Sequence, residues 1–161
     1  MRALAALQKG VRYRLKLFTA VAHSLESYGR MIENIKKGLS PFLCVGLSAI
    51  HKANFIYTAR QDLNTPLLLL TQDDLAAARL AADINAMAGT EDFALVFPSR
   101  DYSYRQMESV SGEYEQQRLG VLSRILQGEA PVVIASAQAA SSRTVQPEAP
   151  RQATFKVSTD P

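Results

Sequence analysis

Gly46-Leu47-Ser48-Ala49-Ile50-His51-Lys52-Ala53 is the stretch on which the fold prediction depends, because it has the spacing of a phosphate-binding loop. A P-loop has the form G-x-x-x-x-G-K-[ST] between a strand and a helix, and its backbone amides hold the phosphates. Gly46 and Lys52 stand at that separation. The apolar run Phe42–Val45 precedes them as a predicted strand, and a helix is predicted from Ala53 to Leu63.

Two substitutions remove the chemistry from this loop. His51 replaces the second glycine, and its Cβ crowds a position where glycine lets the backbone approach phosphate. Ala53 replaces the hydroxyl residue that would hold magnesium. The pattern therefore predicts a nucleotide-binding architecture without hydrolysis, in which Gly46, Ser48 and Lys52 are the candidate phosphate contacts. Weak anion binding and a ligand-free turn remain as alternatives.

The composition is that of one globular domain and excludes several classes of protein. A chain of 161 residues that is 47% hydrophobic and 20% charged is long enough for one α/β domain and too short for two. The net charge of +3 permits contact with nucleic acid but does not argue for it. The lone cysteine, Cys44, excludes an internal disulfide and is expected to be buried. With no signal-peptide core and no membrane-length apolar run, a cytoplasmic protein is expected.

The apolar positions predict strands that alternate with helices. Four nearly continuous apolar runs suit parallel strands covered on both faces, and they are Phe42–Val45, Leu67–Leu70, Ala94–Phe97 and Val132–Ala135. Asp73 and Asp74 start one intervening helix, and Gly89 ends it. Another helix has a predicted core stripe made of Leu119, Leu122, Ile125 and Leu126, and ends at Gly128. This alternation predicts an α/β fold with a parallel sheet.

The N-terminal part carries an apolar stripe from Phe18 to Ile35, which predicts one amphipathic helix that Gly38 and Pro41 end. Packing on its own domain is favoured over dimerisation, because coiled coils need several heptads. The predicted organisation is a helical segment at 1–38, a domain at 39–140, a linker at 141–152 and the start of a further domain at 153–161.

The order and spacing of four stretches resemble the N-terminal region of the bacterial transcription-repair coupling factor family. The stretches are Val45–Ala53, Thr65–Thr71, Phe97–Tyr102 continuing through Glu115–Leu119, and Val132–Ala139 followed by Thr144–Glu148 and a strand at Phe155. The resemblance implies a RecA-like half-domain related to the first domain of UvrB. UvrB keeps its full Walker motif and has a long β-hairpin, for which Ser99–Gly112 is too short.

The resemblance also implies a role in DNA repair. The full-length factor is an ATP-driven, DNA-binding translocase that displaces stalled RNA polymerase and recruits UvrA after DNA damage. ATP, magnesium and double-stranded DNA belong to its motor, which lies outside this sequence. For this chain the resemblance implies no catalytic residue, no metal and no cofactor, and packing on the rest of the parent protein.

Two other functions remain open from the sequence. One is an active P-loop NTPase or helicase fragment of the UvrB type, and the other is a free-standing small interaction protein. Smaller hypotheses concern single groups of residues. Arg100, Tyr102, Tyr104 and Arg105 form a single-strand binding surface or an ordinary packed loop. Glu113, Glu115 and Arg118 are expected to form a charge arrangement at a helix start.

Overall fold

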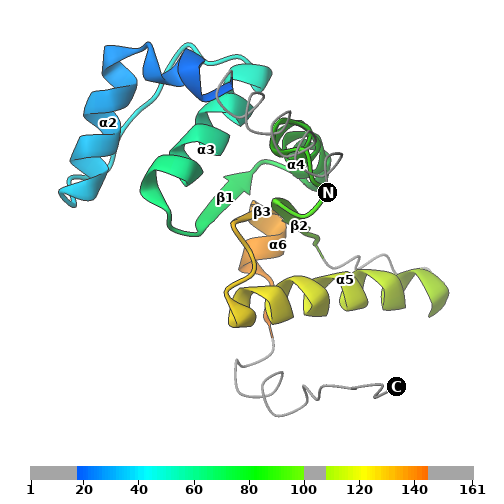
Figure 1. Ribbon diagram of the computed structural model, residues 1–161. Coiled ribbons are helices and arrows are strands. Elements are labelled where there is room, and N and C mark those ends of the chain that lie inside the picture. Colours follow the sequence, from blue (N-terminus) through cyan, green and yellow to red (C-terminus); the bar gives the residue numbers. More distant parts are fainter. Residues whose placement is uncertain (1–17, 100–107, 145–161) are drawn as a thin grey trace, which may run out of the picture.

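The computed structural model describes residues 18–99 and 108–144. A short helix covers residues 18–23. The elements that follow are α2 (Glu26–Lys36), α3 (Ala49–Leu63), β1 (Leu67–Thr71), α4 (Asp74–Ala88), β2 (Ala94–Phe97), α5 (Glu108–Gln127), β3 (Val132–Ser136) and α6 (Ala137–Ser141) (Figure 1). The predicted α/β class is confirmed.

The described strands form one three-stranded parallel sheet in the order β1-β3-β2. The register aligns Leu67 of β1 and Ala94 of β2 with Val132 of β3. All five residues of the central strand β3 are buried, which fits an apolar strand covered on both faces. This open parallel sheet, flanked by helices, is consistent with a RecA-like fold.

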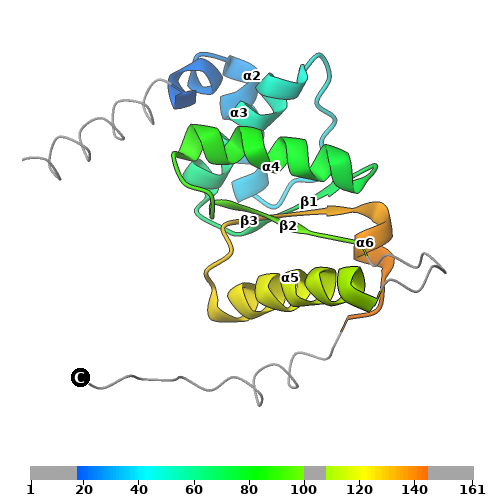
Figure 2. The same ribbon diagram turned by 90° about the vertical axis from the view of Figure 1, so that its right-hand side faces the viewer.

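Helices cover both faces of the sheet. Figure 2 shows α3 and α4 on one side and α5 on the other. The larger core joins α3 and α4 to the sheet through residues such as Tyr57, Ile84 and Ile134. A smaller core on the other face joins Val121 of α5 to Phe97 and other residues of β2 and β3. A third cluster packs α2 on α3.

Local sequence signals predicted several helix and strand boundaries correctly. Asp73 caps α4 because its carboxylate accepts a 2.7 Å hydrogen bond from the Ala76 amide. Gly89 ends that helix in the left-handed conformation with φ 71°. The predicted strands β1, β2 and β3 are all confirmed, with β1 and β3 each one residue longer than expected. Helix α3 begins at Ala49, four residues before the predicted start.

The prediction of a strand at Phe42–Val45 was wrong. The segment pairs with no described strand, and most of it is exposed, Leu43 by 87% and Val45 by 79%. Cys44 is exposed as well, contrary to the buried role expected of it. The physical reason is that an apolar run becomes a strand only beside another strand edge, whereas this one lies along α2. The Cys44 Sγ is 3.9 Å from the Met31 Sδ.

Two helix predictions also need correction. The stripe from Phe18 to Ile35 is not one helix, because Leu25 has extended backbone and separates residues 18–23 from α2. In α5 the buried positions are displaced by about one residue along the sequence from the predicted core stripe. Leu119 is nearly half exposed, whereas its neighbour Arg118 is buried.

Candidate functional site

The predicted phosphate-binding residues lie around the start of α3, and two of them line adjoining grooves. Gly46 has φ 82° and lines a groove of about 650 Å³ beside α2. Lys52 lines a different groove, on the side of β1. Ser48 precedes α3 with an extended backbone, and its Oγ lies 3.1 Å from the Nδ1 of His51 instead of capping the helix. Gly46, Ser48 and Lys52 therefore all lie at the start of α3, and the grooves that Gly46 and Lys52 line adjoin each other, since Cys44, Leu47 and Phe55 line both.

The groove beside β1 has a volume of about 700 Å³ and is the larger of the two. Its walls are mostly apolar, with Leu68 and Leu70 from β1 and Phe55 and Ile56 from α3. Its charged residues are Lys52, Arg79 and Asp83. The sequence analysis singled out Lys52 but missed Arg79 and Asp83, which lie on α4 among alanines and carry no motif.

Apart from the two grooves, a cluster of polar residues lies at the carboxyl edge of the sheet, where ligands bind in many open α/β folds. Asp74, the first residue of α4, accepts hydrogen bonds at Oδ2 from the Ser99 amide at 2.9 Å and the Ser99 hydroxyl at 2.7 Å. Its Oδ1 is buried and makes no regular hydrogen bond within the described residues. The hydroxyl of Ser136, at the end of β3, accepts from the Ala139 amide at 3.1 Å.

The environment of Asp74 favours its charged form. Burial of the carboxylate opposes ionisation, but the hydroxyls of Ser136 and Ser99, the Ser99 amide and the charge of Arg118 outweigh it, so the pKa of Asp74 is lowered. Polar residues directly after three parallel strands could have revealed this cluster from the sequence, because such strand ends meet at one edge.

Arg118 of α5 binds residues at the carboxyl edge of the sheet. Its guanidinium carbon lies 4.1 Å from the ring centroid of Phe97, and its Nη1 donates a 2.6 Å hydrogen bond to the Pro98 carbonyl. The residue is only 2% exposed. Arg118 was expected in a charge arrangement at a helix start, but α5 begins at Glu108, so Arg118 lies inside the helix, where a cation–π contact and a carbonyl hold it in the interior.

The stability of the protein is expected to depend on Asp74 in acid. A carboxyl group whose pKa is lowered by folding stabilises the native state above its unfolded pKa of about 3.9, and that contribution is lost as the pH falls through the folded value. Urea unfolding at pH 7 should therefore show Asp74→Asn less stable than the wild type by about 1–2 kcal/mol. The difference should shrink below about pH 4. A constant difference down to pH 3 would contradict this account.

Another polar cluster joins the short first helix, α2 and α3. The hydroxyl of Tyr28 donates a 2.6 Å hydrogen bond to Asp62 Oδ2, and His23 Nε2 lies 2.9 Å from the same oxygen. Burial and then the neighbouring Asp62 carboxylate raise the pKa of Tyr28, which keeps the phenol protonated. The ring of Tyr28 also packs edge-on against Phe55 at 5.1 Å. These contacts hold the short first helix, α2 and α3 together.

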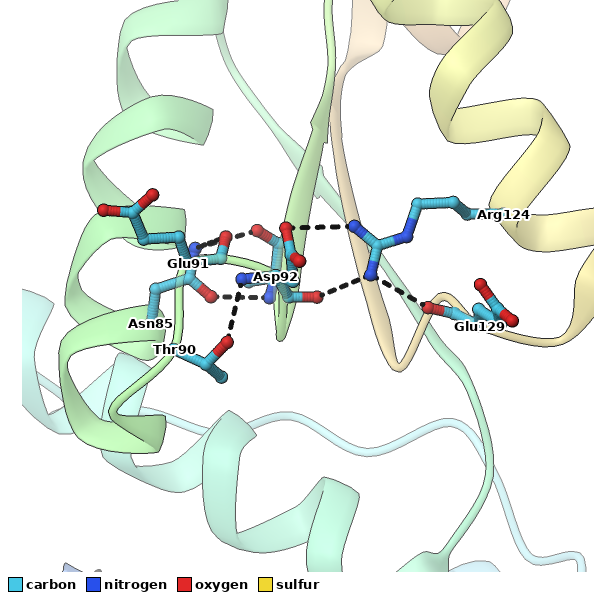
Figure 3. Close-up of polar contacts among 7 residues, drawn as sticks. Asn85, Thr90, Glu91, Asp92, Arg124 and Glu129 are labelled. Atoms are coloured by element: carbon cyan, nitrogen blue, oxygen red, sulfur yellow. Dashed lines mark hydrogen bonds and ion pairs between the residues drawn. The ribbon is translucent and has the colours of Figure 1, made fainter. Parts of the chain in front are cut away.

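The loop that leads into β2 is fixed from both sides (Figure 3). From α4, Asn85 Nδ2 donates to the carbonyls of Glu91 and Ala94 at 2.8 and 3.0 Å, and its Oδ1 accepts from the Ala94 amide at 2.7 Å. From α5, Arg124 forms an ion pair of 3.1 Å with Asp92. These contacts align β2 with the rest of the sheet.

The described residues hold neither a metal-binding cluster nor a membrane-spanning helix. Residues 18–99 and 108–144 include no group of three or more His, Cys, Asp or Glu side chains placed to hold a metal ion. In the same part of the chain, no helix is both long and apolar enough to cross a membrane. The proposed single-strand surface from Arg100 to Arg105 and the strand expected at Ala153–Ser158 lie outside the described residues.

Comparison with known proteins gives one partial likeness. The chain is 27% identical over 110 residues to the transcription-repair-coupling factor of Bacillus subtilis (strain 168). The match covers 68% of this chain but only 9% of that protein, so the chain spans a small part of its relative. No protein-family model and no solved structure matches the chain. The chain is thus similar to one region of a repair factor.

Proposed function

We propose that this chain is a catalytically inactive module of a DNA-repair protein of the transcription-repair coupling type, with a scaffolding or regulatory role. The similarity to one short region of the Bacillus subtilis factor is the observation that carries this proposal. The domain organisation and cytoplasmic location expected from the sequence belong to the same proposal. In it, the motor that uses ATP and acts on DNA lies elsewhere in a longer protein.

The geometry of the former phosphate loop supports the absence of catalysis. A functional loop brings its glycines, its lysine and the helix N-terminus to one phosphate. Here Ser48 is engaged with His51, and Gly46 and Lys52 line two different, adjoining grooves. This arrangement argues against the active NTPase alternative.

A pull-down against purified UvrA tests the proposed context. The bait is this chain and, in parallel, the longer protein if its gene continues in frame beyond Pro161. We expect the longer protein to retain UvrA and the 161-residue chain to release it on washing, because the proposal places the UvrA contact in a following domain. Lys36→Ala, an exposed substitution in α2, serves as a matched control and should change neither result.

Three outcomes would count against the proposal. Capture of UvrA by the short chain would contradict the domain boundary, and no capture by the longer protein would contradict the repair role. A reading frame that ends at Pro161 would favour a free-standing interaction protein instead.

A further inference from the structure

The two grooves beside the start of α3 adjoin each other and form one extended depression. The groove of about 700 Å³ lies along β1, the groove of about 650 Å³ lies along α2, and Cys44, Leu47 and Phe55 line both. We call the two together the double groove. Its lining residues come from α2, the segment 42–47, α3, β1 and α4, so the double groove crosses five segments of the chain.

Large exposed apolar side chains gather in the double groove. Leu43 and Val45 are 87% and 79% exposed, the highest values among the large apolar residues of the described part. The exposed large apolar residues that line the double groove are Leu25, Phe42, Leu43, Val45, Leu68 and Leu70. Soluble proteins normally expose such residues singly, and a group of them marks a site of protein–protein contact or ligand binding. The double groove therefore has the character of a docking surface.

The charged residues of the double groove are mostly basic. They are Arg30 of α2, Lys52 of α3, and Arg79 and Asp83 of α4. Within the described part of the chain, neither Lys52 nor Arg79 forms an ion pair. Arg30 has a 3.8 Å pair with Glu26, and because both side chains are exposed, this pair contributes little. Basic side chains beside apolar ones fit a partner that carries apolar and acidic side chains.

The charge of this chain argues against an occupant from the chain itself. Residues 1–17 include five basic residues and no acidic one, and residues 145–161 include two of each sign. A second copy bound across a two-fold axis would bring the same basic patch against itself. The acidic complement must then come from a different polypeptide.

The distribution of the apolar side chains favours a helical partner. They come from α2, from the segment 42–45 and from β1, so they are spread over an area instead of following one strand. An amphipathic helix covers such an area with apolar anchors that recur every three or four residues.

We propose that the double groove binds an acidic amphipathic helix of another polypeptide. The apolar anchors of that helix enter the double groove, and the acidic side chains beside them pair with Arg30, Lys52 and Arg79. Phe42–Val45 and β1 keep the positions that the structure gives them. The inference does not rest on the proposed role in repair, because it depends only on the shape and charge of this surface.

A titration of the intact ¹⁵N-labelled chain with synthetic helices tests the proposal. The acidic probe is a helix of about 18 residues with leucine at every third or fourth position and glutamate beside each leucine. We expect saturable shifts confined to the amides of the double groove, such as those of residues 43–47 and 68–72. A matched probe with lysine in place of every glutamate should bind at least about 10-fold more weakly.

Three variants separate the apolar and the charged contributions. Leu43→Ser combined with Val45→Ser should weaken the acidic probe at least about 10-fold and leave the thermal unfolding temperature unchanged, because both side chains are exposed. Lys52→Glu combined with Arg79→Glu should reverse the preference between the two probes. Leu119→Ser, on α5 across the sheet, is the matched control and should bind like the wild type.

Four results would overturn the proposal. They are the absence of saturable binding by the acidic probe, equal affinity for the two probes, shifts outside the double groove, and unchanged binding by the double serine variant. Shifts of the same amides that grow with chain concentration in the absence of any probe would assign the surface to a second copy of the chain instead.

Discussion

Replacement of Arg118 with alanine is expected to destabilise the protein by about 3–4 kcal/mol, because it removes a buried cation together with its contacts. The substitution deletes the 2.6 Å hydrogen bond to the Pro98 carbonyl and the cation–π contact with Phe97. It also takes away a positive charge that helps Asp74 to stay ionised. Urea unfolding monitored by circular dichroism measures the loss.

Arg124 provides the matched control for this substitution. It lies on the same helix, six residues further on, and its ion pair with Asp92 is partly exposed to solvent. Arg124→Ala should cost less than about 1 kcal/mol. Arg118→Met keeps most of the apolar stem and should fall between the two alanine variants. Equal losses for Arg118→Ala and Arg124→Ala would contradict the interior role of Arg118.

Replacement of Ile134 with alanine should cost about 3 kcal/mol through loss of apolar burial and creation of a cavity. Ile134 is the middle residue of the central strand β3, is fully buried, and packs in the core that joins α3 and α4 to the sheet. Ile125→Ala is the control, because that side chain is nearly half exposed, and it should cost less than about 1 kcal/mol. Thermal and urea unfolding give both values. A small effect at Ile134 would argue against this packing of the sheet.

The parts of the fold that the sequence predicted well are those with local signals. Helix α4 has an acidic cap at Asp73 and a glycine stop at Gly89, and both were recognised. Strands β1, β2 and β3 are continuous apolar runs between helices, and the alternation was sufficient to predict a parallel sheet.

The errors concern interactions between residues that are distant in sequence. The run Phe42–Val45 has the composition of a strand, but pairing depends on which edge is available, and composition does not report this. Arg118 was assigned to a charge arrangement at a helix start, and its burial was not foreseen because the contacts that bury it come from Phe97 and Pro98, about twenty residues earlier. Sequence periodicity alone could not reveal either partner.

Sequence patterns were equally insufficient to predict the candidate site. The motif named Gly46, Ser48 and Lys52 from their spacing, and in the structure Gly46 and Lys52 line adjoining grooves while Ser48 contacts His51. The cluster of Asp74, Ser99 and Ser136 has no motif, because its members come from three different elements. Only the strand order brings them together.

Titration of the ¹⁵N-labelled chain with magnesium-ATP, followed through its amide NMR spectrum, tests the central claim most directly. We predict that the amides of residues 46–52 show no saturable shift up to millimolar nucleotide, and that the spectrum of Lys52→Ala responds in the same way as that of the wild type. Saturable shifts confined to residues 46–52 in the wild type and absent in Lys52→Ala would contradict the claim that this loop no longer binds a nucleotide.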